Sequence, residues 1–414
     1  MDSVLSWAFL AALGAATAAR LWLAARQARH VRAHRGAVPA AFAGAIPLAA
    51  HQKAADYTVA KTRLGMADAV LSAAIVLALT FGGALQWLSD AWARLAPPFG
   101  VAHGVLLIVS VVVLMAALEL PVSLVRTFVV EARFGFNRMT AALFVADLAK
   151  QALVSAVLGV PLLALVLWLM GRMGALWWLW VWAAWTGFNL LMLVLYPSFI
   201  APLFNKFSPL ADQALAARVE ALLARCGFRA SGLYVMDGSK RSSHGNAYFT
   251  GFGAAKRIVF FDTLLSRLAP AEVEAVLAHE LGHYKRHHVW KRVAILFAAS
   301  LGFLWGLGLL IDRPWFYAGL GVSTMSSATA LLLFVLAVPP FTFFLQPLAS
   351  LLSRRHEFEA DAYAASHASA ADLVRALVKL YQDNAATLTP DPVHSAFYDS
   401  HPPAAARIAR LQAA

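Results

Sequence analysis

The chain has 414 residues, of which 61% are hydrophobic and 14% are charged. A soluble domain has about 45–50% apolar and about 25% charged residues, so this composition excludes an ordinary soluble protein and indicates membrane-spanning helices. The net charge of +12 would suit a nucleic-acid partner, but Lys and Arg collect in the cytoplasmic loops of membrane proteins, and we therefore expect no nucleic acid to bind.

Seven apolar segments are long enough to cross a bilayer, whose core of about 30 Å needs about 20 helical residues. They lie near residues 4–25, 67–88, 102–130, 152–171, 175–199, 292–312 and 324–352. The first carries its basic residues after the apolar run, so we interpret it as a retained span rather than a signal peptide. Glu119 and Arg126 lie seven residues apart in the third span, where such charges face a bundle interior or form a structural ion pair.

The charges of the loops predict how the chain crosses the membrane. The connections after the first and third spans, the stretch 200–291 and the tail after residue 352 are rich in Lys and Arg. The alternate loops carry few positive charges and lie near 89–101, 172–174 and 313–323. By the positive-inside rule, the N-terminus lies outside and the C-terminus lies in the cytoplasm. The Ala-rich composition favours a bacterium, so the inner membrane is the expected location.

Two segments, 200–291 and 353–414, are long enough to fold outside the lipid. The first contains an amphipathic helical pattern and two runs of β-forming residues, SGLYVMDG and RIVFFD, with GNAYFTGFG between them. The second has helical patterns throughout. The expected fold is mainly α: five spans in 1–199, a cytoplasmic domain with a small β-sheet in 200–291, two spans in 292–352 and a C-terminal helical part in 353–414.

The stretch VLAHELGHYKRHHVW, residues 276–290, contains the pattern His-Glu-x-x-His on a predicted helix that opens near Pro270. On a helix, His279 and His283 lie one turn apart on one face, so both imidazoles can bind one ion. Glu280 can then act as the general base on a water at that metal. The pattern predicts a hydrolase site with one zinc ion per chain, three protein ligands and one open position.

The third ligand must lie elsewhere in the chain. A longer metalloprotease pattern requires Gly at position 286 and His at position 289, but Arg286 and Val289 occupy them. On a continued helix His287 would lie two turns from His279, which is too far for a shared tetrahedral site. We therefore expect His287 and His288 to meet the interface or the substrate.

The stretch SRRHEFEADAYA, residues 353–364, offers a better candidate for the third ligand. Glu357 and Asp361 lie four residues apart on one helix face, which alone would suit a solvated acidic surface. The sixth and seventh spans, however, return the chain to the depth of the His-Glu-x-x-His helix. We therefore predict that Glu357 is the ligand, that Asp361 holds a ligand histidine, and that Glu359 points away from the site.

These features resemble the integral-membrane CAAX prenyl proteases of type 1, which are gluzincin zinc endopeptidases related to the HtpX heat-shock proteases. The HtpX proteases share the zinc motif but are shorter and have fewer spans. The resemblance implies seven helices around a water-filled chamber that is capped by the zinc domain. The stretches that carry it are EARFGFNRMT (131–140), YPSFIAPLFNKFSPL (196–210), HGNAYFTGFG (244–253), HELGH (279–283), EFEAD (357–361) and YDSHPPAAARIARL (398–411).

The resemblance also implies roles for residues outside the zinc motif. The pattern HPxxxxR would bring His401 and Arg407 close to the metal, where either side chain could stabilise the oxyanion of the reaction. The stretch GNAYFTGFG is similar to the family's substrate-binding edge strand, which aligns an extended peptide through main-chain hydrogen bonds. In this chain the residues of that strand are Asn246, Ala247, Tyr248 and Phe249.

Three functional hypotheses follow. The first is a membrane zinc endopeptidase that cuts near the C-terminus of prenylated CAAX-type or other membrane-associated peptides, with membrane lipids around it. The second is HtpX-like quality control of membrane proteins, because protein prenylation is not expected in a bacterium. The third is a transporter or scaffold with a structural zinc ion, but such a site normally has four protein ligands and no use for Glu280.

Overall fold

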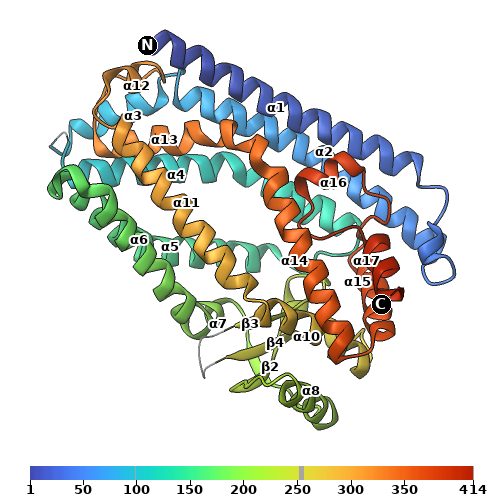
Figure 1. Ribbon diagram of the computed structural model, residues 1–414. Coiled ribbons are helices and arrows are strands. Elements are labelled where there is room, and N and C mark those ends of the chain that lie inside the picture. Colours follow the sequence, from blue (N-terminus) through green and yellow to red (C-terminus); the bar gives the residue numbers. More distant parts are fainter. Residues whose placement is uncertain (98, 251–255, 414) are drawn as a thin grey trace.

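The computed structural model describes residues 1–97, 99–250 and 256–413 (Figure 1). Within this part of the chain, seven helical segments are long and apolar enough to cross a membrane, as predicted. They are α1 (Asp2–Ala33), α2 (Leu48–Leu79), α4 (Val101–Leu124) with its extension to Glu131, α5 (Ala141–Arg172), α6 (Trp177–Leu195), α11 (His288–Leu310), and α13 (Ser327–Thr342) continued by α14 (Gln346–His367).

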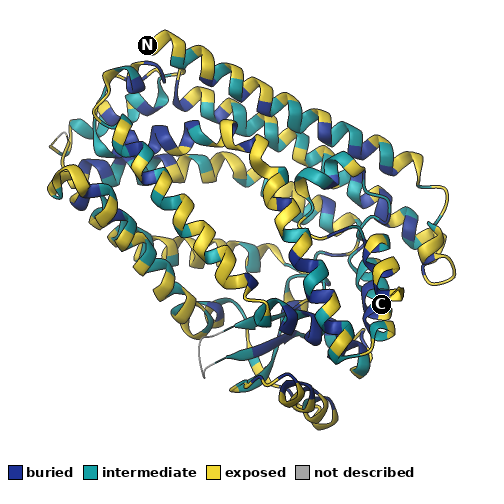
Figure 2. Cartoon of the chain, in the orientation of Figure 1, coloured by how far each residue is buried: buried dark blue, intermediate teal, exposed yellow. Residues whose placement is uncertain are grey.

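The surface of these helices is apolar. Figure 2 shows α5, α6 and α11 exposed along much of their length. Large side chains such as Val157, Trp180, Leu296 and Trp305 are more than half exposed, with exposed fractions of 61%, 55%, 51% and 53%. Apolar surface of this extent is expected to face lipid rather than water.

The second span ends earlier than predicted. The apolar pattern extends to residue 88, but α2 ends at Leu79 and a separate helix, α3, covers Ala84–Ala93. The break lies at Gly83, whose φ of 74° is in the left-handed region that glycine adopts without strain. A local turn has therefore divided an apolar run that hydropathy alone treats as continuous.

The two charged residues of the third span, Glu119 and Arg126, do not pair with each other in the described structure. Arg126 lies 4.0 Å from Asp68 of α2, and within the described residues it forms no ion pair with Glu119. Most of the interval between the two charges belongs to α4, and the π-helical turn from Val125 to Glu131 begins only one residue before Arg126. The chamber implied by the resemblance stays a prediction.

The membrane helices share an apolar core near the N-terminal end of the molecule. Its buried members come from several spans and include Phe9, Leu107, Leu169, Leu307 and Leu333. The remaining helices belong to the other end: α7 (Ala201–Phe204), α8 (Gln213–Arg225), α9 (Asp262–Leu265), α10 (Pro270–Lys285), α15 (Ala370–Asp383), α16 (Pro392–Tyr398) and α17 (Ala404–Gln412), whereas α12 (Pro314–Ala318) connects α11 to α13.

In the described part of the chain, a four-stranded sheet with the strand order β1-β2-β4-β3 lies beside α10. Strands β2 (Gly232–Met236) and β4 (Arg257–Phe261) are the two predicted strands and pair in parallel. Strands β1 (Phe207–Pro209) and β3 (Ala247–Thr250) pair with them antiparallel at the two edges of the sheet. Ile258 and Phe260 of β4 pack with Leu277 and Leu281 of α10 in a second core, which seats α10 on the sheet.

Candidate metal centre

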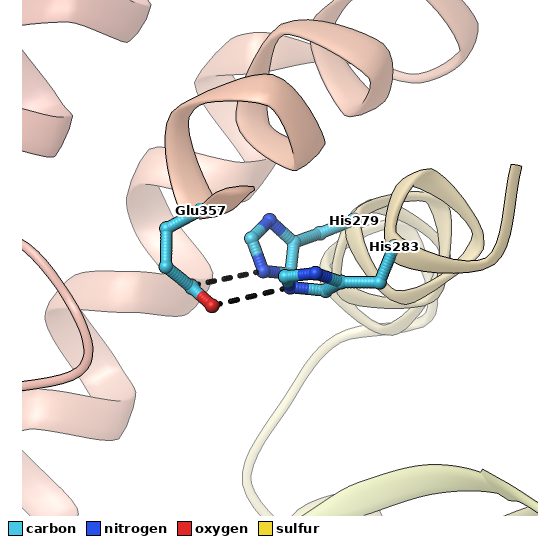
Figure 3. A group of neighbouring side chains, drawn as sticks. All are labelled: His279, His283 and Glu357. Atoms are coloured by element: carbon cyan, nitrogen blue, oxygen red, sulfur yellow. Dashed lines mark ion pairs between the residues drawn. The ribbon is translucent and has the colours of Figure 1, made fainter. Parts of the chain in front are cut away.

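Helix α10 presents the two histidines of the His-Glu-x-x-His motif. It begins at Pro270, and the backbone N–H of Ala269 donates a hydrogen bond of 2.8 Å to the carboxylate of Glu272, which stabilises the first turn. Because Leu277 and Leu281 are buried in the apolar core, a different face of the helix is left for the polar motif. His279 and His283 lie one turn apart on that face, as predicted (Figure 3).

Helix α14 approaches α10 closely enough to complete the site. A Cβ atom on Gly282 would lie only 2.9 Å from the Cα atom of Ala360, so the absence of a side chain at Gly282 permits this contact. Glu357 lies three residues before Ala360 and thereby reaches the two histidines (Figure 3).

The three predicted ligands come together. The Nε2 atom of His279 lies 3.4 Å from Oε2 of Glu357, and Nε2 of His283 lies 3.2 Å from Oε1. All three ligand atoms lie within 4.8 Å of one another. Zinc bound at about 2.0–2.1 Å in a tetrahedral site separates its ligand atoms by about 3.3 Å, so the spacing suits such an ion.

The chemistry of the donor set also fits a cation. Two imidazole nitrogens and one carboxylate oxygen are the ligands of many catalytic zinc sites. Glu357 is buried, and within the described chain its Oε2 atom accepts no hydrogen bond. A buried carboxylate oxygen without a donor is costly, and a bound metal ion removes that cost.

Asp361 holds the first of the histidines. Its Oδ1 atom lies 2.8 Å from Nδ1 of His279, which leaves Nε2 of that ring directed to Glu357. Arg407, which is 5% exposed, donates two hydrogen bonds to Asp361, at 2.8 Å from Nε and 2.6 Å from Nη2. The guanidinium of Arg407 is therefore held against Asp361, although its Nη1 atom lies 3.7 Å from Glu357.

Two residues that we expected elsewhere lie at the site. His288 was predicted to meet the interface or the substrate, but it is 1% exposed and contacts His283. Glu359 was predicted to point away, but it accepts a hydrogen bond from His288. The physical reason is that α10 ends at Lys285 rather than continuing through these histidines, and His287 adopts a left-handed φ of 57°. His287 itself is exposed.

Glu280 and His401 lie beside the three predicted metal ligands, and His401 is more exposed to solvent than Glu280. Burial raises the pKa of the Glu280 carboxyl above its ordinary value, which suits a group that takes and returns a proton. The side chain of His401 is 60% exposed, and its Nε2 atom lies 3.5 Å from Oε2 of Glu357. His401 is thus more exposed than the predicted ligands His279, His283 and Glu357, and solvent or a substrate can reach it.

The predicted substrate strand lies at an edge of the sheet. Strand β3 follows Asn246, is the last strand in the order and contacts α10. Ala247 is buried and Phe249 packs edge-to-face on Phe228, with ring centroids 5.4 Å apart. Asn246 is exposed, and its Oδ1 atom accepts a hydrogen bond of 2.8 Å from the backbone of Ala247. The hydroxyl of Tyr248 lies 3.9 Å from Sδ of Met236.

Known proteins resemble the chain over almost its whole length. The family described as "CAAX prenyl protease N-terminal, five membrane helices" matches residues 27–206, and "Peptidase family M48" matches residues 209–414. A CAAX prenyl protease 1 homolog of Arabidopsis thaliana is 34% identical over 379 residues, 90% of this chain and 89% of the relative.

Further relatives and a solved structure agree. The CAAX prenyl protease 1 of Saccharomyces cerevisiae is 35% identical over 316 residues, which cover 72% of this chain and 69% of the relative. The CAAX prenyl protease 1 homolog of Homo sapiens is 33% identical over 380 residues, which cover 81% of this chain and 80% of the relative. The crystal structure of S. mikatae Ste24p superimposes with a TM-score of 0.90 at 29% identity, covering 98% of each chain.

Proposed function

The chain belongs to the CAAX prenyl protease 1 family of M48 peptidases and is a multi-pass membrane metallopeptidase, and from this premise we propose that it cleaves prenylated CAAX-type peptides near their C-terminus. The observation that carries the proposal is the cluster of His279, His283 and Glu357, whose ligand atoms lie within 4.8 Å of one another. We further propose that the metal is zinc, with one ion per chain. The substrate is then a lipidated or otherwise membrane-associated peptide.

Several residues of the chain have separate roles in the proposed reaction. Zinc, when bound, supplies a Lewis acid that polarises the scissile carbonyl and activates water. Glu280 takes the proton from the attacking water and returns it to the leaving amine. Arg407 donates hydrogen bonds to Asp361, so we assign to it the role of holding Asp361 in place. We assign stabilisation of the oxyanion to the exposed His401. The edge strand β3 offers its main chain to an extended substrate.

We also propose an orientation with the N-terminus outside and the catalytic site in the cytoplasm, in a bacterial inner membrane. The basic stretch between the first and second apolar segments supports this, because its residues Phe42 and Ile46 pack in one cluster with Ala404 and Ile408 of α17, close to the metal centre. The two cytoplasmic segments contribute to one apolar core, which supports a single catalytic domain interrupted by the sixth and seventh spans.

The test is cleavage of a farnesylated CAAX peptide by the purified full chain, with and without a chelator. We expect cleavage that the chelator abolishes and that Glu280→Gln lowers at least about 1,000-fold, since both the base and its proton transfer are lost. Glu220→Gln, the same change at an exposed position of α8, serves as the matched control and should keep wild-type activity. A Glu280→Gln protein that cleaves at the wild-type rate would overturn the role of Glu280.

The other hypotheses predict different outcomes. The zinc-loaded protein could instead leave prenylated peptides intact and degrade unfolded membrane proteins. HtpX-like quality control would then become the better proposal. A structural zinc in a transporter or scaffold is disfavoured, because in the described part of the chain three side chains gather as ligands where a structural site normally has four.

A further inference from the structure

His288 is a buried histidine that the reaction described above does not use. Its Nδ1 atom lies 3.0 Å from Nδ1 of His283, and its Nε2 atom lies 3.0 Å from Oε2 of Glu359. Its ring stacks on that of His356, with centroids 4.0 Å apart and planes inclined by 11°. His288 is therefore enclosed by three polar side chains, one of which is a predicted metal ligand.

The path of the chain between α10 and α11 creates this contact. On one continuous helix, residues five apart would point about 140° away from each other, so His288 could not face His283. Instead α10 ends at Lys285, His287 takes a φ of 57°, and α11 begins at His288. A left-handed conformation at a residue other than glycine costs about 1–2 kcal/mol, so the surrounding structure must hold it in place.

With a metal ion on Nε2 of His283, the hydrogen bonds of His283 and His288 would allow one arrangement of protons. The Nε2 atom of His283 faces Glu357 at 3.2 Å and is the atom available to a metal, so its lone pair must be free and the proton of the ring sits on Nδ1. That Nδ1–H donates to Nδ1 of His288, which must then be an acceptor. His288 consequently carries its own proton on Nε2 and donates it to the carboxylate of Glu359.

We propose that His288 and Glu359 are positioning residues for the metal centre, because together they set the tautomer and the ring orientation of His283. The inference rests on the proposed function, in which His283 is a metal ligand. On the other side of the site, Asp361 acts directly on Nδ1 of His279. Each ligand histidine is then supported by a carboxylate, one directly and one through His288.

The alternative is that His288 merely fills space under α10, and matched variants separate the two roles. His288→Phe keeps a ring that can stack on His356 but cannot accept a hydrogen bond. His288→Asn loses the ring but places a carbonyl oxygen near the position of Nδ1, where it can accept from His283. Glu359→Gln keeps the shape of the side chain and removes its charge. Arg355→Gln removes the exposed partner of Glu359, 3.2 Å away, and serves as the control.

The experiment measures the zinc dissociation constant of each full-chain variant in detergent, by competition with a chelator, and the absorption spectrum of the cobalt-substituted protein. We expect His288→Phe to weaken zinc binding about 10–100-fold and to alter the cobalt spectrum. Glu359→Gln should weaken binding in the same direction, His288→Asn should bind more tightly than His288→Phe, and Arg355→Gln should match the wild type. The thermal-unfolding midpoint of each metal-free variant reports whether it has folded.

Two results would overturn the inference and leave the proposed function intact. One is wild-type zinc affinity in both His288→Phe and Glu359→Gln. The other is equal weakening in His288→Phe and His288→Asn together with wild-type affinity in Glu359→Gln, which is the outcome for a space-filling residue. Failure of the proposed function looks different: the zinc-loaded wild type would not cleave the farnesylated peptide, or His283→Ala would bind zinc as tightly as the wild type does.

Discussion

Glu280 is the residue whose chemistry depends most on its surroundings. Burial disfavours its charged form and raises the pKa of its carboxyl, while His279 and His283 oppose that rise when they are charged. The net direction is upward from the ordinary value of 4.5. A carboxylate with a raised pKa is a stronger base, and so it is better matched to taking a proton from water near neutral pH.

The raised pKa of Glu280 predicts the acid limb of the pH profile. A general base works only when it is deprotonated, so kcat/KM should be constant above the pKa of Glu280 and fall tenfold per pH unit below it. We expect the midpoint of this fall to lie above pH 4.5. The measurement is kcat/KM against pH, with the bound zinc quantified at each pH because metal loss would give a similar decline. A midpoint at or below 4.5 in zinc-loaded protein would contradict the raised pKa.

At the scale of elements, the contact between α10 and α14 decides whether the ligands can meet. Gly282 lies against Ala360, and a Cβ at that position would also lie 3.1 Å from the Cβ atom of Tyr363. The neighbouring atoms include the backbone of α14, which cannot rotate away as a flexible side chain can. The distance between the two helices at the metal centre is thus set by the size of one residue.

Gly282→Ala should therefore separate α10 from α14. We expect it to destabilise the protein by about 1–3 kcal/mol through overpacking and to weaken zinc binding, because Glu357 moves away from both histidines. Differential scanning fluorimetry in detergent and chelator competition measure the two effects. Gly187→Ala is the matched control, since Gly187 lies inside α6 and a Cβ there meets no atom within 4 Å. Equal behaviour of the two variants would show that the close contact does not matter.

At the scale of the whole molecule, a few buried polar contacts attach the sheet domain to the membrane helices. Arg241, just after β2, donates hydrogen bonds of 2.7 Å and 3.0 Å to Asp147 of α5. The same guanidinium donates to Oδ1 of Asn205 at 2.9 Å and to the backbone carbonyl of Phe204 at 2.6 Å. Asp147 is 6% exposed, and Arg241 is a cation in direct contact with its buried carboxylate.

Asp147→Ala should loosen the attachment of the sheet domain. Removing the carboxylate leaves the Arg241 charge with neutral partners only, and we expect a loss of about 1–3 kcal/mol in the free energy of unfolding. Arg241→Ala should have a similar effect, and the double variant should be less destabilised than the sum of the two. Asp56→Ala breaks the exposed pair with Arg35, which lies in the connection after α1, and should change stability by less than about 1 kcal/mol. Additive effects of Asp147→Ala and Arg241→Ala would exclude the coupling.

Features that depend on local periodicity could be predicted without the structure. Hydropathy over about 20 residues predicted all seven spans, and the four-residue spacing of His279 with His283 and of Glu357 with Asp361 predicted shared helix faces. The alternation and clustering of β-formers likewise predicted β2 and β4. Each of these properties is carried by residues within a few turns of one another, so no knowledge of distant contacts was needed.

Features that depend on where helices end and on which elements they contact became known only from the packed structure. Hydropathy did not place the end of α2, because a single left-handed turn at Gly83 interrupts the helix without changing its apolar character. The helical pattern likewise predicted that α10 continues past Lys285, although the helix ends there. The contacts of His288 with His283 and with Glu359 could therefore not be predicted. Those contacts join side chains as far as 71 residues apart, and a distance of that kind exists only after the sixth and seventh spans have packed.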